Sequence, residues 1–159
     1  MSWRALGWDF LGPHIDGKWW VPATLGNRRF RRAVLDTGSS NIIFPGSCGH
    51  PESPDEQVPE QLRIVLCGDF EGGGPILFSP CMGVTRERIG GVGGQHHHHY
   101  EFWLDVEIPG LPVPDLIPVI FMRTNYPIIG LAPFVSAGYR FRFERGGAWV
   151  TRKWRSGKR

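Results

Sequence analysis

The sequence has no apolar run long enough to cross a bilayer. A membrane-spanning helix needs roughly 20 apolar residues, whereas the run from Leu116 to Met122 is short and is interrupted by Pro118. Residues 1–9 also lack the continuous apolar segment of a secretory signal. These absences predict a soluble, cytoplasmic protein with no membrane partner.

Cysteine is scarce as well. The three cysteines, Cys48, Cys67 and Cys81, cannot all pair within the chain, and none has the C-x-x-C spacing that is typical of zinc sites. We therefore expect three reduced thiols, no metal site and no cofactor.

Long helical patterns are missing too. The 22 glycines and 14 prolines lie mostly between short apolar runs, which favours strands and turns. An apolar fraction of 41% with an aromatic fraction of 13% is enough for the core of one domain of this length. The sequence therefore predicts a single, mainly β domain over residues 1–159.

Strand candidates alternate with turn residues along the chain. Residues 21–25 and 30–35 flank Gly26-Asn27, a pair that suits a hairpin turn. Further strands are expected at 62–66, 75–78, 84–88, 100–108, 116–121, 126–130 and 139–143, and an exposed loop at 45–59. The helical spacing of apolar side chains at residues 131–135 predicts one short helix there.

The segment that carries chemistry follows the second strand of this hairpin. Asp36 ends the apolar run Ala33-Val34-Leu35 and precedes Thr37-Gly38-Ser39-Ser40. Such a sequence places a carboxylate on a tight turn whose glycine lets a peptide backbone approach closely. Residues 33–41 resemble the catalytic signature of the aspartic proteases, both pepsin-like and retroviral. The resemblance implies that Asp36 activates a water and that Thr37 supports the turn.

Two further segments match the retroviral branch of this family, in the family's order. Ile89-Gly90-Gly91-Val92-Gly93-Gly94 resembles the glycine-rich flap tip, and Ile128-Ile129-Gly130 resembles the segment that supports the catalytic turn. The glycine run is not a phosphate loop, because no Lys-Ser/Thr follows it. The chain is therefore similar to retropepsins over about residues 20–145, with a basic C-terminal tail at 146–159. The implied fold is a closed-barrel-like acid protease with one short helix near the C-terminus.

The implied activity is that of a homodimeric aspartic endopeptidase. Two carboxylates held close together cannot both ionise, so such a pair shares one proton and works as acid and base. The other aspartates of this chain are not followed by Thr-Gly or Ser-Gly. A second copy of the chain is therefore expected to supply the second Asp36 across a two-fold axis.

The resemblance also implies a set of substrate-binding residues. They are expected to hold an extended polypeptide with apolar or aromatic side chains beside the cut, bound by strand addition under the flap. These residues are Gly38, Ser39, Ser40, Ile89, Gly90, Gly91, Val92, Tyr126 and Ile128.

The sequence departs from the retroviral pattern at two places. Retroviral proteases carry an acidic residue and an arginine that form an ion pair supporting the dimer, and here those places hold Ser40 and Leu131. Both charges are absent together, so no orphan charge remains. One source of dimer stability is nevertheless missing.

Two other functions stay open. The first is a catalytically weak retropepsin-like module for dimerisation or peptide binding. The second is a nucleic-acid-binding β domain, suggested by the net charge of +3 and by basic clusters at residues 28–32 and 152–159. Short basic ends are usually solvated, so nucleic acid is not an expected partner.

The run His96 to His99 is expected to be a solvated strand segment rather than a metal site.

Overall fold

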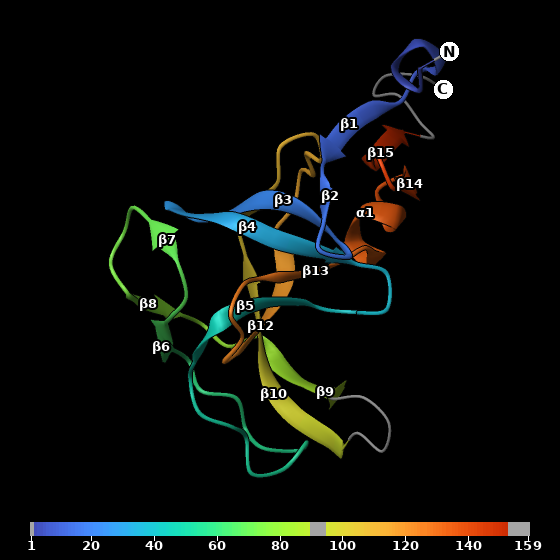
Figure 1. The fold of residues 1–159 in the computed structure, drawn as a ribbon. Coiled ribbons are helices and arrows are strands. Elements are labelled where there is room, and N and C mark those ends of the chain that lie inside the picture. Colours follow the sequence, from blue (N-terminus) through green and yellow to red (C-terminus); the bar gives the residue numbers. More distant parts are fainter. Residues whose placement is uncertain (1, 90–94, 153–159) are drawn as a thin grey trace.

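The computed structural model describes residues 2–89 and 95–152 and contains many strands with one short α-helix (Figure 1). The helix, α1, spans Ala132–Ser136, and a single 3-10 turn, η1, spans Arg4–Leu6. The expected mainly β class with a short helix near the C-terminus is therefore confirmed.

The predicted hairpin is formed by β3 (Lys18–Leu25) and β4 (Arg28–Asp36). Gly26 occupies the turn with a φ of 61°, a conformation that glycine adopts readily. The register passes from Val21↔Ala33 to Ala23↔Phe30, so β4 contains one extra residue at this point. This bulge leaves both Arg31 and Arg32 exposed, while Phe30 and Ala33 on either side are buried.

The central strands are arranged around β13 (Ile128–Gly130). It lies between β4 and β5 (Ile42–Ser47), parallel to the first and antiparallel to the second. Since β4 leads directly into β5, the turn that joins them passes over the end of β13 (Figure 1). Next along the sheet come β12 (Ile117–Met122), parallel to β5, then β10 (Gln95–Leu104) and β9 (Gly83–Ile89).

The closed barrel that the sequence predicts is not found among the described strands. Their order runs from β11 (Val106–Glu107), paired with β3, to β9 at the other end. Closure would require the two ends to pair, but β11 is only two residues long and the β9–β10 hairpin extends away from the body (Figure 1). Short strands branch from the path instead: β2 (His14–Ile15), β6 (Leu62–Leu66), β7 (Phe70–Glu71) and β8 (Ile76–Ser79).

The hydrophobic core lies on one face of these strands. Phe30 and Phe44 meet edge to face with ring centroids 5.3 Å apart, and Phe102 meets Phe121 at 5.5 Å. Phe134 anchors α1 in the same core and is 1% exposed. The helix is therefore held by tertiary packing, which a helix of five residues requires.

A second sheet of three strands joins the two ends of the chain. It contains β1 (Asp9–Gly12), β15 (Gly147–Arg152) and β14 (Tyr139–Glu144), in that order. The sequence assigned residues 147–152 to the basic tail, and the structure places them in β15. The Nε1 groups of Trp3 and Trp19 donate hydrogen bonds to the side chain and the backbone carbonyl of Glu144, respectively, which ties this sheet to the body.

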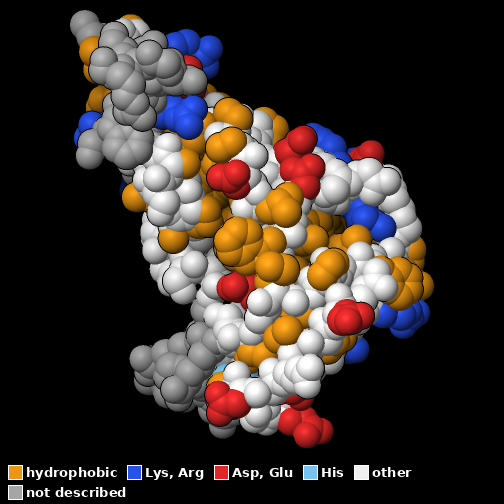
Figure 2. Space-filling model, turned by 180° about the vertical axis from the view of Figure 1, so that it is seen from behind, with side chains coloured by type: hydrophobic (Ala, Val, Ile, Leu, Met, Phe, Trp, Pro, Cys, Tyr) orange, Lys and Arg blue, Asp and Glu red, His pale blue; other side chains and the backbone are white. Residues whose placement is uncertain are grey.

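Apolar side chains also gather across the middle of the surface seen from behind (Figure 2). Large exposed apolar side chains are Leu6, Phe10, Ile15, Val58, Ile76, Phe78, Met82, Trp103, Leu116 and Val135.

Cys48, Cys67 and Cys81 form no disulfide. Within residues 2–89 and 95–152, no helix is long and apolar enough to cross a membrane.

Candidate active site

Asp36 is the last residue of β4 and is half-buried, whereas Thr37 and Gly38 after it are exposed. The Gly38 N–H donates a hydrogen bond of 2.8 Å to Oδ1 of Asp36. The Ser39 N–H donates to the backbone carbonyl of Asp36 at 3.3 Å. The turn thus orients the carboxylate with its own backbone and leaves Thr37 and Gly38 open to a partner.

Gly130 packs against the turn that follows Asp36. Its N–H donates a 3.1 Å hydrogen bond to the Asn41 carbonyl. A Cβ at this position would lie 2.6 Å from the carbonyl oxygens of both Ser39 and Asn41, so no larger residue fits without moving the backbone. The Ile128-Ile129-Gly130 segment thus packs against the Asp36 turn, and its role in supporting a catalytic turn stays a prediction.

The serines of the turn have different environments. The Ser39 hydroxyl donates to the Asn41 carbonyl at 2.9 Å and lies 3.3 Å from the Asn41 N–H, which donates to it. Ser39 is therefore used within the turn, a local pattern that favours turns over regular strands. Ser40 is exposed, as a residue that contacts a substrate or a partner chain must be.

Beside Asp36, an apolar floor crosses four strands on the face away from the main core. Val34, Ile43 and Ile120 are buried but lie outside the core cluster. Ile128 of β13 is paired with Val34 on one side and with Ile43 on the other, and cross-strand partners share a face. We call Val34, Ile43, Ile120 and Ile128 the active-site floor.

An aromatic wall borders the active-site floor. Trp20 pairs with Val34 across the β3–β4 hairpin, and its ring meets that of Tyr126 edge to face at 4.9 Å. The structure thus brings the predicted residues Tyr126 and Ile128 to the face of Asp36. Sequence reasoning missed Trp20 and Arg32, although the period-2 spacing of Arg32, Val34 and Asp36 carries the signal.

The predicted flap is described only in part. Ile89 ends β9 and pairs with Gln95 of β10. Gly90, Gly91 and Val92 lie outside the described residues, so their expected contacts with a substrate stay predictions. In Figure 1, the β9–β10 hairpin and the β4–β5 turn extend toward the same side of the molecule.

Leu131 takes the place of the arginine in the retroviral ion pair. It is half-buried and packs against the core of its own chain at the start of α1. Leu131 thus contributes to the packing of its own chain, directly after Gly130.

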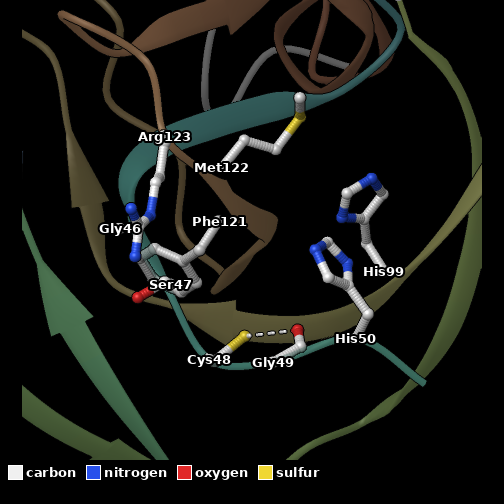
Figure 3. A pocket seen from close by; sticks show the side chains of 9 residues that line it. All are labelled: Gly46, Ser47, Cys48, Gly49, His50, His99, Phe121, Met122 and Arg123. Atoms are coloured by element: carbon white, nitrogen blue, oxygen red, sulfur yellow. Dashed lines mark hydrogen bonds between the residues drawn. The ribbon is translucent and has the colours of Figure 1, made fainter.

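A separate cavity of about 330 Å³ lies between β5, β10 and β12 (Figure 3). His99 and His50 line it with ring centroids 5.4 Å apart, and the Cys48 thiol donates to the Gly49 carbonyl at 3.8 Å. Burial raises the pKa of Cys48 to about 11, so its thiol is protonated near neutral pH and is a poor nucleophile. His99 is 4% exposed, which corrects the expectation of a solvated histidine run at this position.

In the described ranges, no group of three or more His, Cys, Asp or Glu is placed to hold a metal ion. No protein-family model matches the chain, and no curated protein matches it in sequence.

Proposed function

We propose that this chain is the subunit of a homodimeric aspartic endopeptidase of the retropepsin type. The observation that carries the proposal is the position of Asp36. Its carboxylate lies where β4 leads into the exposed turn to β5, and β13 lies between these two strands with Gly130 packed against the turn. This arrangement holds a carboxylate rigidly while leaving it accessible, as acid–base catalysis requires.

Hydrolysis needs two such carboxylates sharing one proton. The ionised Asp36 takes a proton from a water, whose oxygen attacks the scissile carbonyl carbon, while the protonated Asp36 of the second copy donates to the carbonyl oxygen. The tetrahedral intermediate then collapses, the C–N bond breaks, and the leaving amine takes up a proton. The products are a carboxylic acid and an amine, and water is the only co-reactant.

The second carboxylate is assigned to another copy of the chain because Asp36 is the only aspartate followed by Thr-Gly or Ser-Gly. A two-fold axis close to the exposed Thr37 and Gly38 would bring both Asp36 turns together. Each subunit then contributes one active-site floor to a common cleft. In this dimer, the retroviral ion pair is replaced by Ser40 and Leu131.

The active-site floor and aromatic wall support an extended polypeptide as the substrate. Ile128 and Tyr126 are half-buried and offer apolar and aromatic surface on the face of Asp36, with Val34 buried beside them. Gly38 leaves room for a substrate backbone to approach the carboxylate, and the β9–β10 hairpin would cover the peptide as a flap. We expect apolar or aromatic side chains beside the cleaved bond.

A mixed peptide library incubated with the pure protein tests the activity. We expect cleavage by the natural chain, loss of cleavage in Asp36→Asn, and unchanged cleavage in Asp55→Asn, a control in the loop that follows β5. Equal cleavage by the natural chain and Asp36→Asn would overturn the catalytic assignment. Peptide binding without cleavage by the natural chain would support the alternative, a retropepsin-like peptide-binding module.

A further inference from the structure

The β4 bulge presents two neighbouring arginines in different surroundings. Arg31 forms an ion pair with Glu71, and the bonded carboxylate raises the pKa of its guanidinium. Arg32 lies over the Trp20 ring instead, with its guanidinium carbon 5.1 Å from the ring centroid. Only Arg31 is thus neutralised by a carboxylate partner.

Arg32 forms no ion pair with any carboxylate in the part of the chain that the structure describes. Asp69 lines the same small hollow as Arg32 and Tyr126, but it does not reach ion-pair distance. The Arg32 side chain is exposed. Its positive charge is therefore available to a partner in solution.

Trp20 holds this charge in a defined place. The Trp20 Nε1–H donates a 3.0 Å hydrogen bond to the Ile15 carbonyl, and Tyr126 packs edge to face against the ring. An aromatic face attracts a guanidinium and restricts its motion. Arg32 is thus positioned more firmly than an isolated surface arginine.

Arg32 also lies on the face of the proposed catalytic residue. It precedes Asp36 by four positions, and alternate residues of a strand share a face. At 3.3 Å per residue, the two Cα atoms are about 13 Å apart along β4. A substrate strand that lies along β4 would have the same spacing, so Arg32 would meet a side chain beyond the residue at the cleaved bond.

We infer that Arg32, supported by Trp20, selects an acidic side chain in the substrate at a position separated from the cleaved bond by at least one residue. The inference rests on the proposed peptidase function and names a substrate class for it. Because a two-fold dimer carries Arg32 at both ends of its cleft, the preference is expected on both sides of the cut. A carboxylate on a guanidinium forms a charge-assisted hydrogen bond that an amide or ammonium group does not replace.

Paired peptides that differ only by Glu, Gln or Lys at each flanking position test the inference. We expect the natural chain to cleave the Glu peptide with a kcat/KM about three- to tenfold higher than the Gln peptide, since the ion pair is partly solvated. This ratio should fall to about one in Arg32→Gln and decrease at high salt. Arg32→Lys should keep part of it, because the charge remains but the planar stacking is lost.

Arg31→Gln is the matched control, because it removes the adjacent arginine, which is already paired with Glu71. We expect the Glu/Gln ratio to survive in this variant. A ratio near one in the natural chain, or the same loss in both variants, would overturn the inference while leaving peptidase activity intact.

A binding measurement separates this inference from the proposed function. Fluorescently labelled Glu and Gln peptides are titrated into Asp36→Asn and into Asp36→Asn with Arg32→Gln. We expect Asp36→Asn to bind the Glu peptide more tightly than the Gln peptide, and we expect this difference to disappear when Arg32→Gln is added. That result supports the inference even if the natural chain cleaves no peptide, an outcome that would overturn only the peptidase proposal. Equal binding of both peptides to Asp36→Asn contradicts the inference.

Discussion

The Asp36 turn and the Cys48 cavity both contain a potentially reactive side chain, and they differ in what fixes that group. Asp36 is oriented by the Gly38 N–H and supported by Gly130. Cys48 is half-buried, its thiol donates a hydrogen bond to the Gly49 carbonyl, and the loss of solvent around it raises its pKa to about 11. A reactive residue type in a cavity is thus insufficient, because the surroundings must favour its reactive form.

The two places also differ in how accessible they are to a partner molecule. The Cys48 cavity is partly open and is lined by strand residues such as Phe121 and Met122 and by the loop after β5 (Figure 3). The Asp36 turn is open on one side, where Thr37 and Gly38 are exposed. An open turn can meet a second copy of itself, whereas a walled cavity suits a small molecule.

The largest expected effect comes from replacing the support of the Asp36 turn. Gly130→Ala places a methyl group against two backbone carbonyls, so we expect a loss of about 2–4 kcal/mol in the free energy of unfolding together with loss of peptidase activity. Denaturant unfolding and peptide cleavage check both effects. Gly146→Ala is the control, because a Cβ there meets no atom within 4 Å. Similar stability of the two variants would show that β13 does not hold the turn.

The pH dependence of activity distinguishes the two reactive groups. A shared-proton pair of Asp36 carboxylates loses its proton as pH rises, so activity should peak in mildly acidic solution and then fall. A Cys48 thiolate would form only as pH approaches the raised pKa of about 11, so its reaction would speed up in alkaline solution. We therefore expect an acidic optimum that Cys48→Ser leaves unchanged. A rate that still increases above neutral pH would argue against the aspartate pair.

The smallest effect concerns the loop next to the Cys48 cavity. The Tyr100 hydroxyl donates a hydrogen bond to Glu56, which lowers the pKa of Glu56 and raises that of Tyr100 to about 12. A lowered carboxyl pKa stabilises the fold above the unfolded-state value, and this contribution is lost as pH falls through the folded-state value. Tyr100→Phe should therefore destabilise the protein slightly near neutral pH and not in strong acid.

Denaturant unfolding of the natural chain and of Tyr100→Phe, at about pH 7 and about pH 3, measures this difference. Peptidase activity should change little, because the bond anchors a loop outside the Asp36 turn. An equal loss of stability at both pH values would mean that packing of the ring edge, rather than the bond to Glu56, is responsible.

Local patterns predicted much of the fold and the centre of the site. Gly26-Asn27 predicted the β3–β4 hairpin, and the residues after Leu35 predicted the tight turn that carries Asp36. The position of β13 between β4 and β5 is a long-range pairing, which period-2 alternation alone does not specify. The resemblance of Ile128-Ile129-Gly130 to a known support segment implied a role beside the turn, but it did not predict this strand order.

The missed features depend on distant contacts. β15 was assigned to a basic tail because its C-terminal end is charged, but its apolar residues Ala148 and Val150 are buried against partner strands. Arg31 and Arg32 looked like one basic cluster, and only the β4 bulge separates their surroundings. The burial of His99 likewise depends on a distant contact with His50, in the loop after β5, which a run of histidines does not reveal.

Mixing the natural chain with Asp36→Asn tests the shared active site most directly. The two are unfolded together and refolded in varied ratios at constant total concentration, so that subunits combine at random. If each site needs Asp36 from two chains, an equal mixture should have about one quarter of the natural activity, because only dimers of two natural chains are active. Activity of about one half, in direct proportion to the natural chain, would show that each chain acts alone and would contradict the account.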